Sequence, residues 1–266
     1  MEQNRFSGGA ATAAAGLQLA EKGGFVPSRI ASGNGSRAFE DEAHAAFQEL
    51  VMGHTFPCVG ARAAFNSESY ALATYRQIVD TETTAALARD LYEFTRSDIR
   101  RDSEYATFVA VFRGPTHQTE QQFEGALWSQ LQQLNRLDAT HFDWDHTAQS
   151  DPTDPQFSFS FAGQALYVIG MHPNSSRLAR QFPWPTMIFN PHEQFERLRA
   201  DGKWKRMQET IRERDVELQG SINPMLSDFG ESTEARQYSG RAVEADWRAP
   251  FDATKPASVG KCPFGH

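Results

Sequence analysis

The sequence predicts an α+β fold: a single domain whose mixed or mostly antiparallel sheet is covered by helices, with a long extended C-terminal segment. Three observations predict it. Helical periodicity dominates the first half of the chain, a strictly alternating β-hairpin follows, and a later strand runs directly into a helix. No internal repeat and no linker separates these segments, so we assign them to one domain.

Amphipathic periodicity predicts three helices in the first part of the chain, over residues 39–52, 67–78 and 82–94. A run rich in β-branched and aromatic residues then predicts a strand over residues 105–112, which Gly114 and Pro115 end. Leucines at spacings of three and four predict a further helix over residues 118–137.

The second half begins with the clearest β pattern in the chain. Phe157, Phe159 and Phe161 alternate with serines, Ala162-Gly163 makes a turn, and residues 166–171 return as a buried strand. Three phenylalanines on one face of this strand predict that the strand covers an apolar partner.

The remaining elements are a strand, two helices and an extended end. Residues 185–189 form the strand, and Asn190, Pro191 and His192 open a helix that continues to Leu198. Residues 204–218 form a charged helix, and the last fifty residues are extended with short turns.

The 266 residues are 39% hydrophobic and 23% charged, as expected for a globular chain. We expect a flexible N-terminal arm over residues 1–38, a main domain over 39–250 and a C-terminal tail over 251–266. The arm contains Glu2 where an export signal carries positive charge, and no run of apolar residues is long enough for a transmembrane helix.

The charge balance restricts the partners. Thirty-four acidic residues against 26 basic ones give a net charge of −8, which disfavours nucleic acid and anionic membranes. Cys58 and Cys262 are too few for a disulfide framework, so we expect a cytoplasmic protein. The small-residue arm could reach across a homodimer.

The most concentrated polar cluster follows the strand over residues 166–171. Pro173 fixes the direction of His172, and the buried strand that precedes His172 keeps water away from it. Both properties suit an iron ligand. Arg177 and Arg180 suit carboxylates, such as heme propionates or the carboxyl group of an amino acid. A hydrogen-bonded histidine at a strand end with two solvated arginines is the structural alternative.

Two other residues compete as iron ligands. His192 would sit at the first turn of a helix, where the positive helix end keeps an imidazole neutral, or it is a simple polar residue at a helix start. Cys58 could supply a thiolate, or it is an inert buried thiol.

A non-heme iron site is a further alternative, because His141 and Asp143 have the His-x-acid spacing of a facial triad. About one such pair is expected by chance in a chain of this composition. No phosphate-binding glycine loop, dinucleotide fingerprint or serine-hydrolase motif is present in the sequence, so no nucleotide cofactor is indicated.

Several long segments in order resemble the YqcI/YcgG family. They are Phe56-Pro57-Cys58-Val59-Gly60-Ala61-Arg62, Phe157-Ser158-Phe159-Ser160, Gly170-Met171-His172-Pro173-Asn174-Ser175-Ser176-Arg177, Phe189-Asn190-Pro191-His192-Glu193-Gln194-Phe195, Asn223-Pro224-Met225-Leu226, Glu234-Ala235-Arg236-Gln237-Tyr238-Ser239-Gly240-Arg241 and Cys262-Pro263-Phe264.

This resemblance implies a heme-dependent N-oxygenase with heme b (iron protoporphyrin IX). Members of that family hydroxylate arginine in D-cycloserine biosynthesis, hydroxylate pre-guanitoxin, or convert lysine to 6-nitronorleucine. The implied partners are a basic amino-acid substrate and either dioxygen with an electron donor or hydrogen peroxide. Hydroxylation of the guanidino group of L-arginine to Nω-hydroxy-L-arginine is the first expectation, and oxidation of the L-lysine ε-amino group to the nitro amino acid is the alternative.

With that activity, the expected roles can be stated residue by residue. His172 binds iron, with His192 and Cys58 as alternative ligands. His192 and Glu193 handle protons and oxygen, Arg177 and Arg180 anchor the propionates, and Phe157 and Phe159 wall the macrocycle. Glu68 and Asp143 are candidates for binding the basic nitrogen. A non-heme iron oxygenase and a non-catalytic heme carrier or sensor remain as competing functions.

Overall fold

The computed structural model describes residues 37–254 of the chain. Most of the predicted arm, the final part of the predicted tail, and Cys262 therefore lie outside the described residues. No helix within the described range is long and apolar enough to cross a lipid bilayer.

A five-stranded mixed sheet with the strand order β1-β2-β5-β4-β3 forms the centre of the fold. The first two strands are parallel and all other pairs are antiparallel. Their bounds are β1 (Tyr70–Gln77), β2 (Thr107–Gly114), β3 (Phe159–Phe161), β4 (Gln164–Met171) and β5 (Thr186–Pro191). The predicted α+β class with a mixed sheet in one domain is confirmed.

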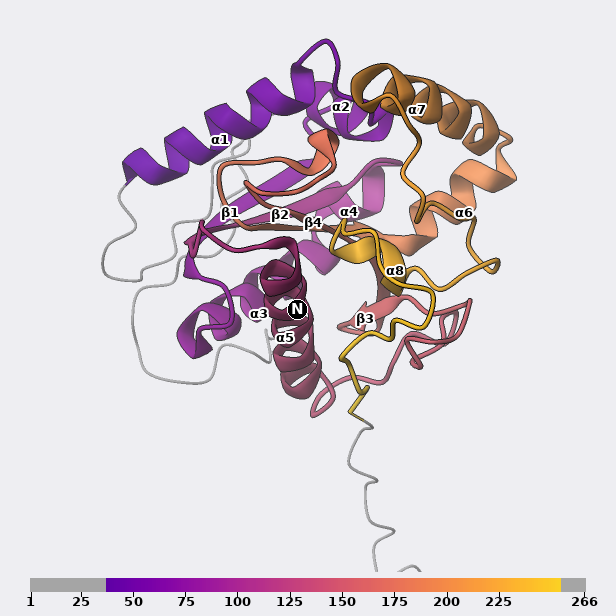
Figure 1. Cartoon of the computed structure of the whole chain (residues 1–266). Coiled ribbons are helices and arrows are strands. Elements are labelled where there is room, and N and C mark those ends of the chain that lie inside the picture. The colour runs from indigo at the N-terminus through magenta and orange to yellow at the C-terminus, as the bar shows by residue number, and fades with distance from the viewer. Residues whose placement is uncertain (1–36, 255–266) are drawn as a thin grey trace, which may run out of the picture.

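Helices cover both faces of this sheet (Figure 1). One face carries α1 (Arg37–Met52), α2 (Val59–Asn66) and α7 (Trp204–Gln219). The other face carries α3 (Thr81–Arg96) and α5 (Glu120–Asp138). The remaining elements are α4 (Asp98–Asp102), the 3-10 helix η1 (Leu178–Arg180), α6 (His192–Ala200) and α8 (Ala235–Tyr238).

Side-chain alternation along β4 divides the interior into two clusters. Ile169 and Met171 belong to the apolar cluster beneath α1, whereas Leu166 and Val168 belong to the cluster beneath α3 and α5. Successive residues of a strand point to opposite faces, so the parity of a β4 residue fixes its side of the sheet.

The helix predicted over residues 67–78 is wrong, because this segment forms β1. Its residues Tyr70–Tyr75 are all buried, since α1 packs on one face of the strand and α3 on the other. A strand buried on both faces does not alternate in polarity, so the helical and extended patterns cannot be separated there. The short helices α2 and α4 were also not predicted.

The other predicted elements are present, with shifted ends. One boundary matters for the site: β5 continues through Pro191 and α6 begins at His192. Pro191 is thus the last residue of β5, whereas the sequence had predicted it as the first residue of the helix.

The hairpin phenylalanines are core residues. Phe157, Phe159 and Phe161 are fully buried. The rings of Phe157 and Phe159 lie near those of Trp144 and Phe251, at centroid distances of 6.1–6.3 Å. They therefore cover the C-terminal segment where it crosses this side of the sheet.

Candidate functional site

A cavity of about 250 Å³ lies between the sheet and the helices α1, α2, α6 and α7. Its walls are mostly apolar, and the chain segments that form them are far apart in sequence. The apolar and aromatic lining includes Phe47, Phe56, Ala61, Phe65, Tyr105, Tyr167, Ile169, Met171, Ile188, Phe195, Leu198, Trp204, Met207 and Ile211. A concave apolar pocket with a few convergent polar groups is the usual form of a small-molecule site.

Cys58 places a sulfur atom in the cavity wall. It is the N-cap of α2, and its Sγ accepts a hydrogen bond from the backbone N–H of Ala61 at 3.4 Å. Pro57 precedes it and is buried, so the backbone enters the helix at a fixed angle. Burial raises the pKa of the Cys58 thiol, while the Ala61 and Gly60 N–H groups and the charge of Arg180 act in the opposite direction.

Arg177 and Arg180 also border this cavity. Arg177 donates to Asp215 at 2.6 Å in a buried ion pair. Arg180 donates to the carbonyl oxygens of Gly170 and Gln237, at 3.0 and 3.3 Å. Within residues 37–254 no carboxylate forms an ion pair with Arg180, although the charge of Asp215 acts on it at longer range.

Two polar atoms in the cavity lining lack hydrogen-bond partners among the described residues. They are the Thr107 hydroxyl oxygen on β2 and the Gln194 Oε1 on α6, and both are buried. A buried polar atom without a partner costs free energy unless a ligand or water satisfies it. Both atoms are therefore available to hydrogen-bond a ligand or water in the cavity.

A second cavity of about 140 Å³ adjoins the first. The two share Tyr167, Phe195, Trp204, Ile211 and Leu226 as lining residues. The wall of the second cavity also contains Arg199, Gln208, Arg212, Glu234 and Gln237. The two cavities thus share a wall, and both are mainly apolar with charged side chains at the edge.

His172 borders neither cavity. Its ring stacks on Phe123 of α5 with the centroids 4.5 Å apart, which places it on the opposite side of the sheet from Cys58. Burial lowers the pKa of His172, and its Nδ1 has no hydrogen-bond partner among the described residues. The structure does not bring this predicted ligand together with Arg177 and Arg180 around one cavity.

His192 lies beside the second cavity without lining it. It is the first residue of α6, and its Nε2 is 3.4 Å from Oε1 of Glu234, which does line that cavity. Its ring also packs on Phe229 at a centroid distance of 4.4 Å. Glu234 is the site residue that sequence reasoning missed, although it begins one of the segments that carry the family resemblance.

The other predicted site residues lie elsewhere. Glu193 is exposed and pairs with Arg100 at 2.6 Å, which holds the pKa of this carboxyl below its usual range. Glu68 and Asp143 are exposed and line neither cavity. Phe157 and Phe159 belong to the core beneath α5, so these five side chains do not converge on the cavities.

The proposed facial triad is not assembled in the described part of the chain. His141 and Asp143 are both exposed, and no group of three or more His, Cys, Asp or Glu side chains within residues 37–254 could hold a metal ion. A heme iron differs in this respect, because it takes only one or two axial ligands from the protein.

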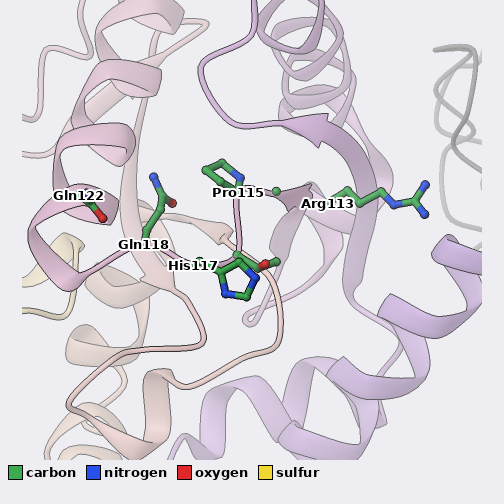
Figure 2. Close-up of a pocket in the computed structure, with 7 residues that line it drawn as sticks. Arg113, Pro115, His117, Gln118 and Gln122 are labelled. Carbon is green, nitrogen blue, oxygen red and sulfur yellow. The ribbon is translucent and has the colours of Figure 1, made fainter.

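A surface hollow of about 700 Å³ lies at the loop between β2 and α5. Figure 2 shows Arg113, Pro115, His117, Gln118 and Gln122 around it. Arg113 extends away from the other four, so the two basic groups of this hollow do not converge on a common point. The enclosed pair of cavities is therefore the better candidate site.

The fold and the site define an α+β protein with two adjoining, mainly apolar cavities, one of which has a cysteine in its wall. The chain belongs to the YqcI/YcgG family, whose family model matches residues 47–252. This match covers every segment that lines the two cavities.

Two relatives come from Bacillus subtilis (strain 168), and both are described as uncharacterized. YcgG is 27% identical over 220 residues, which cover 80% of this chain and 81% of YcgG. YqcI is 26% identical over 216 residues, which cover 79% of this chain and 80% of YqcI. No solved structure matches this chain significantly.

Proposed function

We propose that this protein is a heme-dependent N-oxygenase in which the larger cavity would hold heme b and Cys58 would bind its iron. The observation that carries the proposal is the cavity itself: apolar walls, one cysteine sulfur and a buried guanidinium without a carboxylate partner in the described chain. The resemblance to heme-dependent N-oxygenases supports the choice of cofactor and reaction.

The residues of the cavity fit the parts of a heme. A flat apolar macrocycle needs apolar and aromatic walls, and the propionates need cationic donors. Arg180 is the stronger propionate candidate, because Arg177 is already paired with Asp215 at 2.6 Å. The free hydrogen-bonding capacity at Thr107 and Gln194 could serve water or substrate.

Cys58 is preferred over His172 and His192 because its side chain borders the cavity and theirs do not. The N–H groups of Gly60 and Ala61 stabilise a negatively charged sulfur at the start of α2, as does the nearby Arg180. Heme supplies the oxygen activation when it is bound. The protein's own part is to orient the substrate nitrogen, exclude water and supply protons.

The substrate we propose is a free basic amino acid, with L-arginine converted to Nω-hydroxy-L-arginine. Oxidation of L-lysine to 6-nitronorleucine is the nearest alternative. Dioxygen with an electron donor, or hydrogen peroxide, is the co-substrate. The net charge of −8 favours a cationic ligand.

The test is an absorption spectrum of the purified chain with and without added hemin. We expect a Soret band, and the ferrous carbonyl spectrum should have the position typical of thiolate ligation. Cys58→Ser should lose that thiolate signature, whereas the matched variant His172→Ala should keep it. A parent spectrum typical of histidine ligation that is lost in His172→Ala would move the ligand to the α5 side, and a colourless protein that takes up no hemin would refute the function.

Turnover distinguishes an enzyme from a heme carrier. Mass spectrometry of reactions with L-arginine and L-lysine, given peroxide or a reductant, should detect addition of oxygen to the side-chain nitrogen. A six-coordinate spectrum that resists ligand exchange, with no product, would instead indicate a carrier or sensor.

A further inference from the structure

The smaller cavity contains a buried acid that has no lysine or arginine partner in the described chain. Glu234 is 5% exposed. Within residues 37–254 no lysine or arginine nitrogen lies within 4.0 Å of its carboxylate. Its polar contacts are the Tyr238 hydroxyl at 3.4 Å and the His192 Nε2 at 3.4 Å. Both distances are longer than ordinary hydrogen bonds, so this carboxylate retains most of its capacity for a cationic partner.

Basic groups line the same cavity from α6 and α7. Arg212 has one ion-pair contact, to Asp228 at 4.0 Å, which is too long for a hydrogen bond. Arg199 is paired with Glu196 and lies over the ring of Trp204 at 5.0 Å from the centroid. Arg212 is therefore the guanidinium with capacity for an anion.

An acid and a guanidinium that border one small cavity match the two charges of an α-amino acid. We propose that the second cavity binds the zwitterionic end of the substrate, with Glu234 on the α-ammonium group and Arg212 on the α-carboxylate. The side chain then passes Tyr167 and Phe195, which line both cavities, and brings its terminal nitrogen into the larger one. This placement rests on the proposed function, because it takes the larger cavity as the reaction compartment.

His192 acts in this arrangement as a positioning residue. Its Nε2 has no hydrogen-bond partner among the described residues and faces the Glu234 carboxylate.

The experiment measures binding of three probes to the full chain by calorimetry, with heme loaded where the chain takes it up. The probes are L-arginine, agmatine, which lacks the carboxylate, and des-amino-arginine, which lacks the α-ammonium group. We expect Glu234→Gln to weaken L-arginine binding by at least about tenfold while des-amino-arginine binding stays within about twofold. Arg212→Gln should weaken L-arginine in the same way and leave agmatine unchanged.

Glu213→Gln is the matched control, because Glu213 is an exposed acid on α7 beside Arg212. It should bind all three probes as the parent does. The same set with L-lysine, cadaverine and the des-amino analogue of lysine covers the alternative substrate.

Equal losses for all probes in Glu234→Gln would overturn the proposal, and so would a parent chain that binds none of the amino acids. These failures are separate from failure of the proposed function. The Soret band reports the cofactor in every variant, and it should be unchanged in Glu234→Gln and Arg212→Gln. A chain without pigment that still discriminates the three probes would retain the amino-acid site and lose the oxygenase assignment.

Discussion

At the scale of single residues, Asp138 is the clearest source of pH-dependent stability. It ends α5, is buried, and accepts a hydrogen bond from the Ala162 N–H at 2.8 Å. Burial raises its pKa to about 7, even though the Ala162 N–H and the charge of Arg96 act in the opposite direction. The folded protein therefore keeps a proton on this carboxyl in a range where the unfolded chain has lost it.

The sign of the effect follows from this difference. The stabilising contribution is fully present below the unfolded pKa of about 3.9 and is lost as the pH rises through about 7. Asp138→Asn keeps the acceptor oxygen but cannot ionise. Urea unfolding between pH 4 and pH 8 should give a free energy that declines more steeply with pH in the parent than in the variant, by roughly 1–4 kcal/mol over the range.

Asp143→Asn is the control for this measurement, since Asp143 is exposed and lies close to Asp138 in sequence. It should preserve the parent's slope. Identical slopes in the parent and Asp138→Asn would show that the burial of this carboxyl has no thermodynamic consequence.

The sequence located the polar cluster after β4 but not the side of the sheet on which each member lies. His172 follows Met171, so it has the opposite parity to Ile169 and Met171, which face the cavity. A sequence shows which residues of one strand share a face. It does not show on which of the two faces the helices leave room for a cavity. Cys58 is only an alternative ligand at the level of sequence, because the short helix α2 that positions it was not predicted.

At the scale of elements, the contact of β4 with α5 depends on the absence of a side chain at Gly170. A Cβ there would lie 2.6 Å from the Leu127 Cδ1, 2.7 Å from the Phe123 Cε1 and 2.9 Å from the Tyr238 carbonyl oxygen. The last of these is a backbone atom, so rotamer changes cannot relieve the clash.

Gly170→Ala should therefore lower the free energy of unfolding by about 1–3 kcal/mol, measured as a shift of the urea midpoint. Gly125→Ala, within α5, is a control of opposite sign. A Cβ at Gly125 would meet no heavy atom of the described residues within 4 Å, and alanine favours a helix interior by about 1 kcal/mol over glycine. If both variants lose stability equally, close packing at Gly170 is not the cause.

Elements with one buried face were predicted well, and β1 was not. The helices α1, α3, α5 and α7 each alternate polarity with the helical period, so the pattern identifies them. β1 is buried on both faces, and alanines at positions 71 and 73 fit either conformation. Only the packing partners on its two sides distinguish a strand from a helix there.

At the scale of the whole molecule, a buried charge network fastens the C-terminal segment to α5. Glu124 accepts from the Arg241 Nε and Nη2 at 3.0 and 3.1 Å and from the Trp247 Nε1 at 3.0 Å. The Ser239 hydroxyl donates to the same carboxylate at 3.1 Å. This single acid thus holds three residues of the extended segment that closes the second cavity at Glu234.

Glu124→Gln should destabilise the protein by about 3 kcal/mol, because it leaves the buried Arg241 without its main partner. It should also increase cleavage of the C-terminal segment in limited proteolysis. Glu244→Gln is the matched control: Glu244 pairs with the same arginine at 2.9 Å but is exposed, and its loss should have a much smaller effect on the free energy of unfolding. Equal effects of the two substitutions would contradict the importance of burial.

The candidate site could not be assembled from the sequence because its parts are distant along the chain. Cys58, Tyr167, Arg180 and Glu234 meet only after the sheet has paired β4 with β5 and α7 has packed against α2. The family resemblance identified the segments that contribute to the site, but it did not show how these segments lie relative to one another in space. Glu234 lies within one of them, yet nothing in its local sequence distinguishes it from a surface acid.

Tyr167 belongs to the walls of both cavities, and its hydroxyl donates to Gln237 at 2.9 Å. In the binding mode proposed above, a ligand held at Glu234 has to extend past this ring before its other end reaches the larger cavity. With the proposed function, homologues of the amino acid shortened by one methylene should stop before the larger cavity, so that the protein selects chain length without any contact to the terminal nitrogen.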